Sequence, residues 1–218
     1  IGLEEEISIV AYCLMDNHIH LIIKGELDDI SMALKRVNIK YAMNFNVNND
    51  RVGHVFQGRY KSEIIADDKY LLQVVRYIHN NPVNAKMVTN ISSYKWSSYN
   101  EYIKGKYNVV NPEEASFIMD FFSGKQNLFR EFHNETDFII YLDTKEEVEA
   151  RRLDISKALI YGYFDKHNIK DFSKFKEDKE HQKRLIKILL EKSQISHRQI
   201  AALLEVKSST VHAISSNM

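Results

Sequence analysis

A strongly apolar segment near the N-terminus constrains the fold of this chain more than any other feature. One apolar run covers residues 7–15 and stops at Asp16 and Asn17, and a second run follows over residues 18–23. Two β-rich segments that flank a short Asp-Asn turn are typical of a hairpin. The sequence therefore predicts an antiparallel pair of strands at the start of the chain.

Apolar residues recur at helical spacing after the hairpin. Every third or fourth residue over 28–45 is apolar, which predicts an amphipathic helix, with Asp28 or Asp29 placed to cap it. Residues 55–65 return to strand composition. Asp67 then caps a second predicted helix, whose buried stripe is Tyr70, Leu71, Val74, Val75 and Ile78. Pro82 is expected to end this helix, because the residue before a proline is pushed out of the helical region.

The net charge of zero hides an uneven distribution of 30 basic and 30 acidic side chains. Residues 1–107 carry a net +1, residues 108–150 a net −7 and residues 151–218 a net +6. These shifts predict a first domain over 1–107, an acidic helical linker over 108–150 and a basic all-α domain over 151–218. A basic domain is typical of a polyanion binder, and a solvated helical surface is the alternative.

The basic domain ends in a pattern that resembles a helix-turn-helix. Helical segments are predicted over 155–164 and 182–191, and a short capped helix begins at Ser196. A turn over 205–208 and a second short helix over 209–214 follow. The first helix carries Arg198 and Gln199; the start of the second has Lys207, Ser208, Ser209, Thr210 and His212 as candidate DNA contacts. A plain helical bundle is the alternative.

Composition excludes several classes of protein. Apolar residues make up 44% of the chain, which is too many for a disordered protein. No stretch approaches the roughly 18 consecutive apolar residues of a membrane span, so we expect no membrane segment. Because the single cysteine, Cys13, has no partner for an internal disulfide, we expect a reducing, cytoplasmic location.

Two histidines in the second predicted strand are candidate metal ligands. On a strand, residues i and i+2 point to the same face, so His18 and His20 project together. Their neighbours Ile19, Leu21 and Ile23 are then expected to point the other way, into the core. Two imidazoles at one surface suit a divalent cation, although a His-x-His spacing also arises by chance.

The helix that precedes Pro82 offers a nucleophile and polar side chains. Tyr77 and Asn81 are four residues apart and therefore lie one above the other on one helix face. His79 is two residues from Tyr77 and faces away from it. A packed tyrosine with a solvated hydroxyl is the alternative for Tyr77.

These residues occur in strings that resemble a known family. Residues 12–22, YCLMDNHIHLI, closely resemble the metal-binding signature of the single-tyrosine HUH transposases. Residues 55–61, VFQGRYK, and 77–83, YIHNNPV, are similar to the branch known as REP-associated tyrosine transposases. The blocks agree in order and spacing, and the resemblance covers residues 5 to about 103, including 96–99, WSSY.

The resemblance implies a fold and a site. It implies an α+β core with a ferredoxin-like antiparallel sheet, followed here by the all-α C-terminal domain. His18 and His20 would be metal ligands, Tyr77 the nucleophile and Asn81 the third ligand, with His79 as the competing candidate. The family normally has a strand and a helix before the HUH strand. Because the chain begins shortly before His18, we expect the core to lack them.

The resemblance also implies a reaction. Such enzymes use Mg²⁺ or Mn²⁺, cleave single-stranded DNA near hairpins through a 5′-phosphotyrosine and later rejoin the strands. Candidate contacts to the single strand are Arg36, Lys40, Arg59, Tyr60 and Lys61, for which a solvated surface is the alternative. Related transposases include homodimers and monomers, so both states stay open.

Two other functions remain as alternatives. The chain is a DNA-binding regulator if its HUH unit is inactive and only the helix-turn-helix works. It is a small-molecule phosphoesterase if the histidine pair acts without Tyr77. The acidic segment is a linker, an inhibitory cover or a partner surface, and the sequence does not choose among them.

Overall fold

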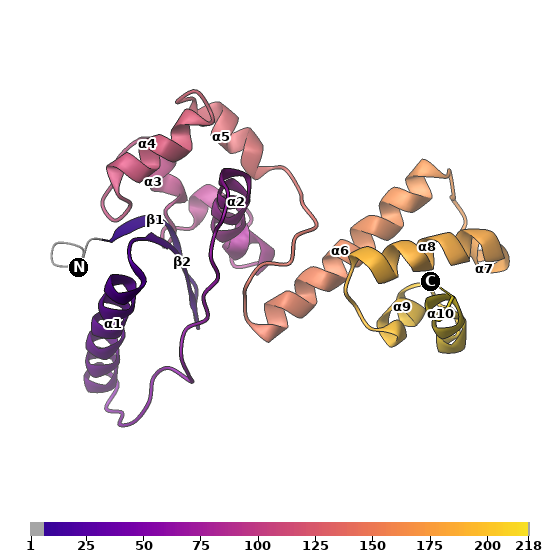
Figure 1. The fold of residues 1–218 in the computed structure, drawn as a ribbon, viewed down its shortest axis with the longest axis horizontal. Helices are drawn as coiled ribbons and strands as arrows, with labels where there is room; N and C mark the ends of the chain where they lie inside the picture. The colour runs from indigo at the N-terminus through magenta and orange to yellow at the C-terminus, as the bar shows by residue number, and fades with distance from the viewer. Residues whose placement is uncertain (1–6, 218) are drawn as a thin grey trace. The chain divides into compact units, whose positions relative to one another are not determined.

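The computed structural model describes residues 7–217, which form an α+β protein (Figure 1). Within this range there is one two-stranded antiparallel sheet, together with ten α-helices and a short 3₁₀ helix. The chain divides into a first unit that ends at Glu135 and a second unit that begins at Thr136. None of the helices in the described range is long and apolar enough to cross a bilayer.

The predicted hairpin is confirmed. Strand β1, Ser8–Leu14, pairs antiparallel with β2, Ile19–Lys24. The backbone N–H of Met15 donates to the His18 carbonyl at 2.9 Å and closes the turn. Pairing shifts between Ile9 and Ala11, so Val10 forms a bulge. The Val10 carbonyl accepts the Tyr102 hydroxyl at 2.6 Å, which ties the bulge to the rest of the first unit.

The orientation predicted for β2 is wrong. Ile19 and Leu21 are 47% and 37% exposed, whereas Ile22 is 5% exposed and lies on the same face as His20. Helix α2, Asp68–Asn84, packs against both strands. The face that carries the histidines is therefore covered in part by this helix, and the face with the isoleucine and leucine is the more open one.

Helix α1, Leu27–Asn48, confirms the first predicted helix but not its cap. The N-cap is Glu26, which makes no side-chain capping bond. Asp28 and Asp29 lie instead in the first turn, where carboxylates interact favourably with the helix dipole. Only Ala33 of this helix is buried, so its apolar stripe is mostly half-exposed.

The strand predicted over residues 55–65 is not formed. This segment has no regular structure and runs back to α1, where the Tyr60 hydroxyl lies 3.1 Å from Ser31 Oγ. The Phe56 ring also packs against Tyr41 of α1, with centroids 5.8 Å apart, so side-chain contacts rather than strand pairing hold this segment. The second edge of β1 is occupied by residues 96–98: Leu14 N–H donates to the Trp96 carbonyl at 2.8 Å, and Ser98 N–H donates to the Tyr12 carbonyl at 3.0 Å.

Helix α2 begins as predicted but ends later. The Asp67 side chain accepts from Tyr70 N–H at 2.8 Å, which confirms the cap. The helix continues through Pro82 to Asn84, so the prediction that the proline ends it is wrong. A proline this close to the C-terminus removes one helical hydrogen bond, while Ala85 N–H still donates to the Asn81 carbonyl at 2.8 Å.

The rest of the first unit is helical. It comprises the 3₁₀ helix η1, Ile91–Ser93, and helices α3, Tyr99–Lys104, α4, Pro112–Asp120, and α5, Gln126–His133. Ile118 of α4 and Phe129 of α5 are fully buried. Residues 108–135 of the predicted acidic linker therefore belong to the core of the first unit.

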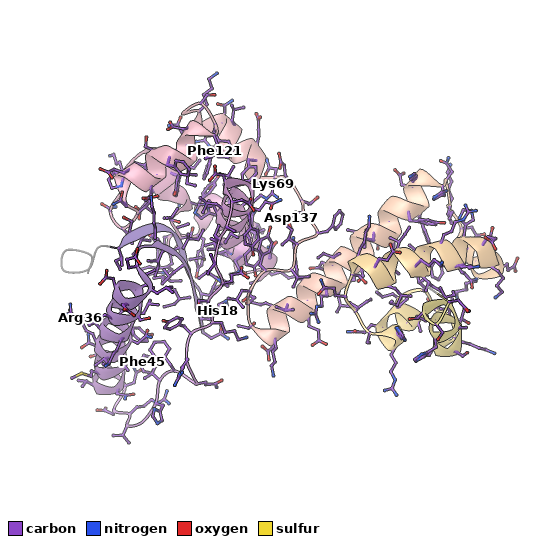
Figure 2. All side chains as sticks on the ribbon, in the orientation of Figure 1. His18, Arg36, Phe45, Lys69, Phe121 and Asp137 are labelled. Atoms are coloured by element: carbon purple, nitrogen blue, oxygen red, sulfur yellow. The ribbon has the colours of Figure 1, made fainter. Side chains whose placement is uncertain are left out.

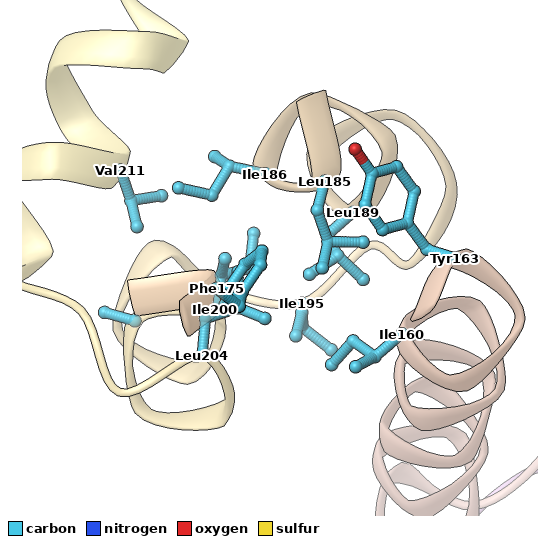
Figure 3. Close-up of a cluster of buried hydrophobic side chains, with 11 residues drawn as sticks. Ile160, Tyr163, Phe175, Leu185, Ile186, Leu189, Ile195, Ile200, Leu204 and Val211 are labelled. Atoms are coloured by element: carbon cyan, nitrogen blue, oxygen red, sulfur yellow. The ribbon is translucent and has the colours of Figure 1, made fainter. Parts of the chain in front are cut away.

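The second unit is all-helical. It contains α6, Lys145–Lys166, α7, Phe172–Glu177, α8, Lys179–Lys192, α9, His197–Leu203, and α10, Ser208–Ser215. The two segments predicted over 155–164 and 182–191 lie within α6 and α8. Residues from all five helices, with Ile195, form one apolar core (Figure 3). Its fully buried members include Leu185, Ile186, Leu189, Ile200, Leu204 and Val211.

Candidate active site

The histidine pair lies where the hairpin turn enters β2. His18, labelled in Figure 2, is the last residue of the turn, and His20 is the second residue of the strand. Their Nε2 atoms lie 3.0 Å apart, and the two ring planes are at 88°. Both side chains are half-buried. The two rings therefore point at one spot, which solvent reaches.

Helix α2 brings two further predicted residues to this spot. The amide group of Asn81 lies 2.7 Å from His20 Nε2, and the Asn81 side chain is buried. The Tyr77 ring, one turn earlier on the helix, has its centroid 5.9 Å from that of His20. The structure thus brings together His18, His20, Tyr77 and Asn81.

The donor set fits a small divalent cation. His20 Nε2 offers either one proton or one lone pair, yet both His18 Nε2 and the Asn81 amide lie within 3.0 Å of it. A cation accepts lone pairs from both imidazoles and from the amide oxygen, whose position is interchangeable with that of the amide nitrogen. A separation of 3.0 Å also suits neighbouring ligands on an octahedral ion with bonds of about 2.1 Å.

Asn17 orients the His18 ring, although the sequence predicted only a turn at this residue. Its Oδ1 lies 2.7 Å from His18 Nδ1. An amide oxygen accepts, so His18 Nδ1 carries the proton and its Nε2 keeps a lone pair. Outer partners of this kind fix the tautomer of metal-binding histidines. The sequence feature that could have indicated this role is that Asn17 directly precedes His18.

His79, the competing ligand, lies elsewhere. It is fully buried, with Nδ1 2.9 Å from His133 Nε2 and Nε2 2.7 Å from Ser98 Oγ. His133 Nδ1 lies 2.7 Å from the Phe129 carbonyl, which only accepts. His133 therefore donates from Nδ1 and accepts from His79 Nδ1–H, and His79 accepts from the serine hydroxyl. Both nitrogens of His79 are used, so its place in the structure favours Asn81 as the third ligand.

Burial keeps this second histidine pair uncharged. Desolvation lowers the pKa of His133 to about 4, against a smaller opposing effect of the Phe129 carbonyl. Desolvation, with a further contribution from His133, holds the pKa of His79 well below its usual value. The role of His133 was not predicted, because nothing near it in the sequence marks a partner 54 residues away.

The candidate single-strand contacts of the first unit lie on adjoining elements. Arg36 and Lys40 are exposed one turn apart on α1, and Arg36 is marked on this helix in Figure 2. Arg59 and Lys61 are exposed on either side of Tyr60, which reaches α1 through Ser31. The structure therefore gathers all five candidates on α1 and the segment packed along it.

The candidate contacts of the second unit differ in their availability. Arg198, Lys207, Ser209 and His212 are exposed, and Thr210 is half-buried. Gln199 is committed to a capping box, because its Oε1 accepts from Ser196 N–H and from Ser196 Oγ, each at 2.8 Å. The His212 ring packs edge-on against His197, with centroids 4.5 Å apart.

The first unit resembles tyrosine transposases in sequence. Residues 1–81 match the family described as "Transposase IS200 like", and this region includes His18, His20, Tyr77 and Asn81. A protein of Haemophilus influenzae named "Putative REP-associated tyrosine transposase" is 28% identical over 116 residues. The predicted resemblance is therefore confirmed.

The comparisons cover part of each protein. The aligned region is 48% of this chain and 64% of the Haemophilus protein, so it spans less than two thirds of that relative. No solved structure matches this chain.

Proposed function

We propose that the first unit cleaves and rejoins single-stranded DNA, with Tyr77 as nucleophile and His18, His20 and Asn81 as ligands of Mg²⁺ or Mn²⁺. The observation that carries this proposal is the meeting of the histidine pair with Asn81 and Tyr77. Asn81 follows His20 by 61 residues, yet its amide lies 2.7 Å from the imidazole. A structural histidine pair has no need of an adjacent tyrosine and amide.

The proposed chemistry begins at the Tyr77 hydroxyl. A tyrosine with an ordinary pKa near 10 is a poor nucleophile at neutral pH. A cation held by the three ligands would polarise the scissile phosphate and favour the phenolate. The phenolic proton goes to solvent, the Tyr77 oxygen bonds to phosphorus, and the bond from phosphorus to the 3′ oxygen breaks. That oxygen takes a proton and leaves as a 3′-hydroxyl.

The product keeps the energy of the diester bond. The 5′ end of the cleaved strand stays attached to Tyr77 as a phosphotyrosine. Attack by a 3′-hydroxyl on this phosphorus reverses the step and rejoins strands without ATP.

The proposal assigns a role in DNA binding to each unit. The first is a ferredoxin-like HUH core that grips the single strand through Arg36, Lys40, Arg59, Tyr60 and Lys61. In the second, α9 and α10 act as a helix-turn-helix on a duplex or hairpin stem. Arg198, Lys207, Ser209, Thr210 and His212 make contacts there, while Gln199 holds the start of α9. Monomeric and homodimeric forms both fit this proposal.

A gel assay tests the reaction. The full chain is incubated with Mn²⁺ and a dual-labelled, single-stranded hairpin library, and protein-linked oligonucleotide is sought on a denaturing gel. We expect an adduct that is lost in Tyr77→Phe and on chelation of the metal. Tyr161→Phe, a change at an exposed tyrosine of the second unit, is the matched control and keeps the adduct.

Two outcomes would replace the proposal. DNA binding without any adduct would make the protein a DNA-binding regulator with an inactive HUH unit. Turnover of small nucleotides that survives Tyr77→Phe would make it a phosphoesterase.

A further inference from the structure

Helix α5 docks onto the helix that carries Tyr77. Arg76 of α2 is 4% exposed, and its Nη1 donates to the Phe132 carbonyl at 3.3 Å and to Glu135 Oε2 at 2.7 Å. Its guanidinium also lies 4.4 Å from the centre of the Phe132 ring. One buried side chain of α2 therefore holds both the end of α5 and the residues that follow it.

A second set of contacts lies one turn further along α2. Asn80 Nδ2 donates to the His133 carbonyl at 2.9 Å, and His79 meets the His133 ring at 2.9 Å. The last carbonyls of a helix have no partner within it. On α5, Asn80 donates to the His133 carbonyl, and Arg76 shares the Phe132 carbonyl with the Glu135 N–H, which donates to it at 3.2 Å.

The geometry of a helix links these contacts to the proposed site. Successive residues are about 100° apart around the axis, and residues four apart lie one above the other. Arg76 and Asn80 thus form one stripe along α2, and Tyr77 and Asn81 form the next. A rotation of α2, or a slide along its axis, would break the first stripe's bonds to α5 as it moved the second stripe away from His20.

We propose that α5 is a brace for the nucleophile's helix, and that Arg76, Asn80 and His133 are positioning residues for Tyr77 and Asn81. This inference rests on the proposed function. The brace lies outside residues 1–81, the region matched to the transposase family, and within the acidic segment. Residues 126–135 would then hold Tyr77 in position. This matters because a misplacement of the reacting group by about 1 Å costs roughly 100-fold in rate.

The test compares two asparagines that make the same kind of bond. Asn80→Ala removes the amide that donates to the His133 carbonyl. Asn100→Ala is the matched control, since Asn100 Nδ2 donates to the Ser92 carbonyl at 2.9 Å, outside α2 and α5. Both variants are made in the full chain. Measurements are the single-turnover cleavage rate, single-strand affinity in a Tyr77→Phe background, and amide hydrogen exchange of residues 70–81.

We expect Asn80→Ala to slow cleavage roughly 10- to 100-fold, with DNA affinity changed less than about twofold. Exchange of the α2 amides should quicken, and Asn100→Ala should alter neither rate nor exchange in α2. Glu135→Gln is a second variant that keeps the fold, because this side chain is 63% exposed. It should weaken the hold on Arg76 and slow cleavage by a smaller factor.

Three results would overturn the brace. The first is a wild-type cleavage rate in Asn80→Ala together with unchanged hydrogen exchange of the α2 amides. An equal loss of DNA affinity and rate is the second, because it would make Asn80 a DNA contact. If the wild-type protein forms no adduct, the proposed function fails, and the hydrogen exchange of the α2 amides alone tests the brace. Quicker exchange in Asn80→Ala then supports the brace. Unchanged exchange is the third result that would overturn it.

Discussion

The first unit contains two histidine pairs with nearly the same separation and different surroundings. The Nε2 atoms of His18 and His20 lie 3.0 Å apart, and His79 Nδ1 lies 2.9 Å from His133 Nε2. The first pair is half-buried, and His20 Nε2 has two polar neighbours, His18 Nε2 and the Asn81 amide. The second pair is buried, and each of its nitrogens has one partner.

The role of a histidine pair is therefore indicated by the groups that its ring nitrogens contact, rather than by the distance between the two rings. Around His79 and His133 a carbonyl and a hydroxyl complete a chain that needs neither charge nor ion. Around His18 and His20 the neighbour is the Asn81 amide, 2.7 Å from His20 Nε2. The buried pair should therefore govern stability, and the open pair should govern metal affinity.

The largest expected effect comes from His133→Ala. It removes a buried ring and leaves the His79 N–H without an acceptor, so the free energy of unfolding should fall by about 3 to 5 kcal/mol. Urea unfolding followed by the fluorescence of Trp96, the single tryptophan, reports this unit. His54→Ala, at an exposed histidine of the same unit, is the control, within about 0.5 kcal/mol of wild type. An equally small effect of His133→Ala would contradict a structural role.

Acid should weaken the same pair. Because the pKa of His133 falls from 6.5 to about 4 on folding, the unfolded chain binds a proton in this interval that the folded chain does not. Stability from His133 is therefore complete above pH 6.5 and is lost as pH falls toward 4, by about 3 kcal/mol. Urea unfolding at pH 7.5 and 4.5 measures the loss, which should shrink in His133→Gln. An unchanged difference in that variant would exclude His133 as its source.

His18→Ala should show the opposite behaviour. Loss of a ligand should weaken Mn²⁺ binding by more than the roughly 100-fold upper range for loss of an outer partner. The free energy of unfolding should change by less than about 1 kcal/mol, because the ring is half-buried. Titration calorimetry and urea unfolding of the same sample test both parts. Wild-type metal affinity would place the ion elsewhere.

The smallest effect is expected from Asn17→Ala. The change removes the acceptor that holds the proton on His18 Nδ1, so Mn²⁺ affinity should fall roughly 10-fold with little change in stability. Asn90→Ala, in a turn that caps η1, is the matched control and should bind the ion normally. Equal affinities in the two variants would show that Asn17 serves only the turn.

The sequence predicted the features that depend on near neighbours. The hairpin follows from two apolar runs around Asp16 and Asn17, and the start of α2 follows from its Asp67 cap. Tyr77 and Asn81 share a helix face by their spacing, and their nearness to the histidine pair was expected through the resemblance to transposases. The distances from Tyr77 and Asn81 to the histidine pair could be obtained only from the structure, because they join segments about 60 residues apart in the sequence.

Features that depend on distant partners were missed or misread. Residues 55–65 have strand composition, but the segment contacts α1 through side chains, Tyr60 at Ser31 and Phe56 at Tyr41, and forms no strand. The strand pattern showed that Ile19 and His20 face opposite ways, but which face is covered depends on where α2 packs. His79 and His133 pair across 54 residues, for which no local pattern exists.

The 54 residues between His79 and His133 also determine when each histidine is added during synthesis. The ribosome adds His133 54 residues after His79, which at 5–20 residues per second is an interval of about 3 to 10 seconds. Tyr77 is thus added to the chain well before the acceptors of Arg76 and Asn80. When only residues 1–81 have been made, Tyr77 is present but α5, which contacts its helix, is not, so the contacts between α2 and α5 form only after residue 133 has been added.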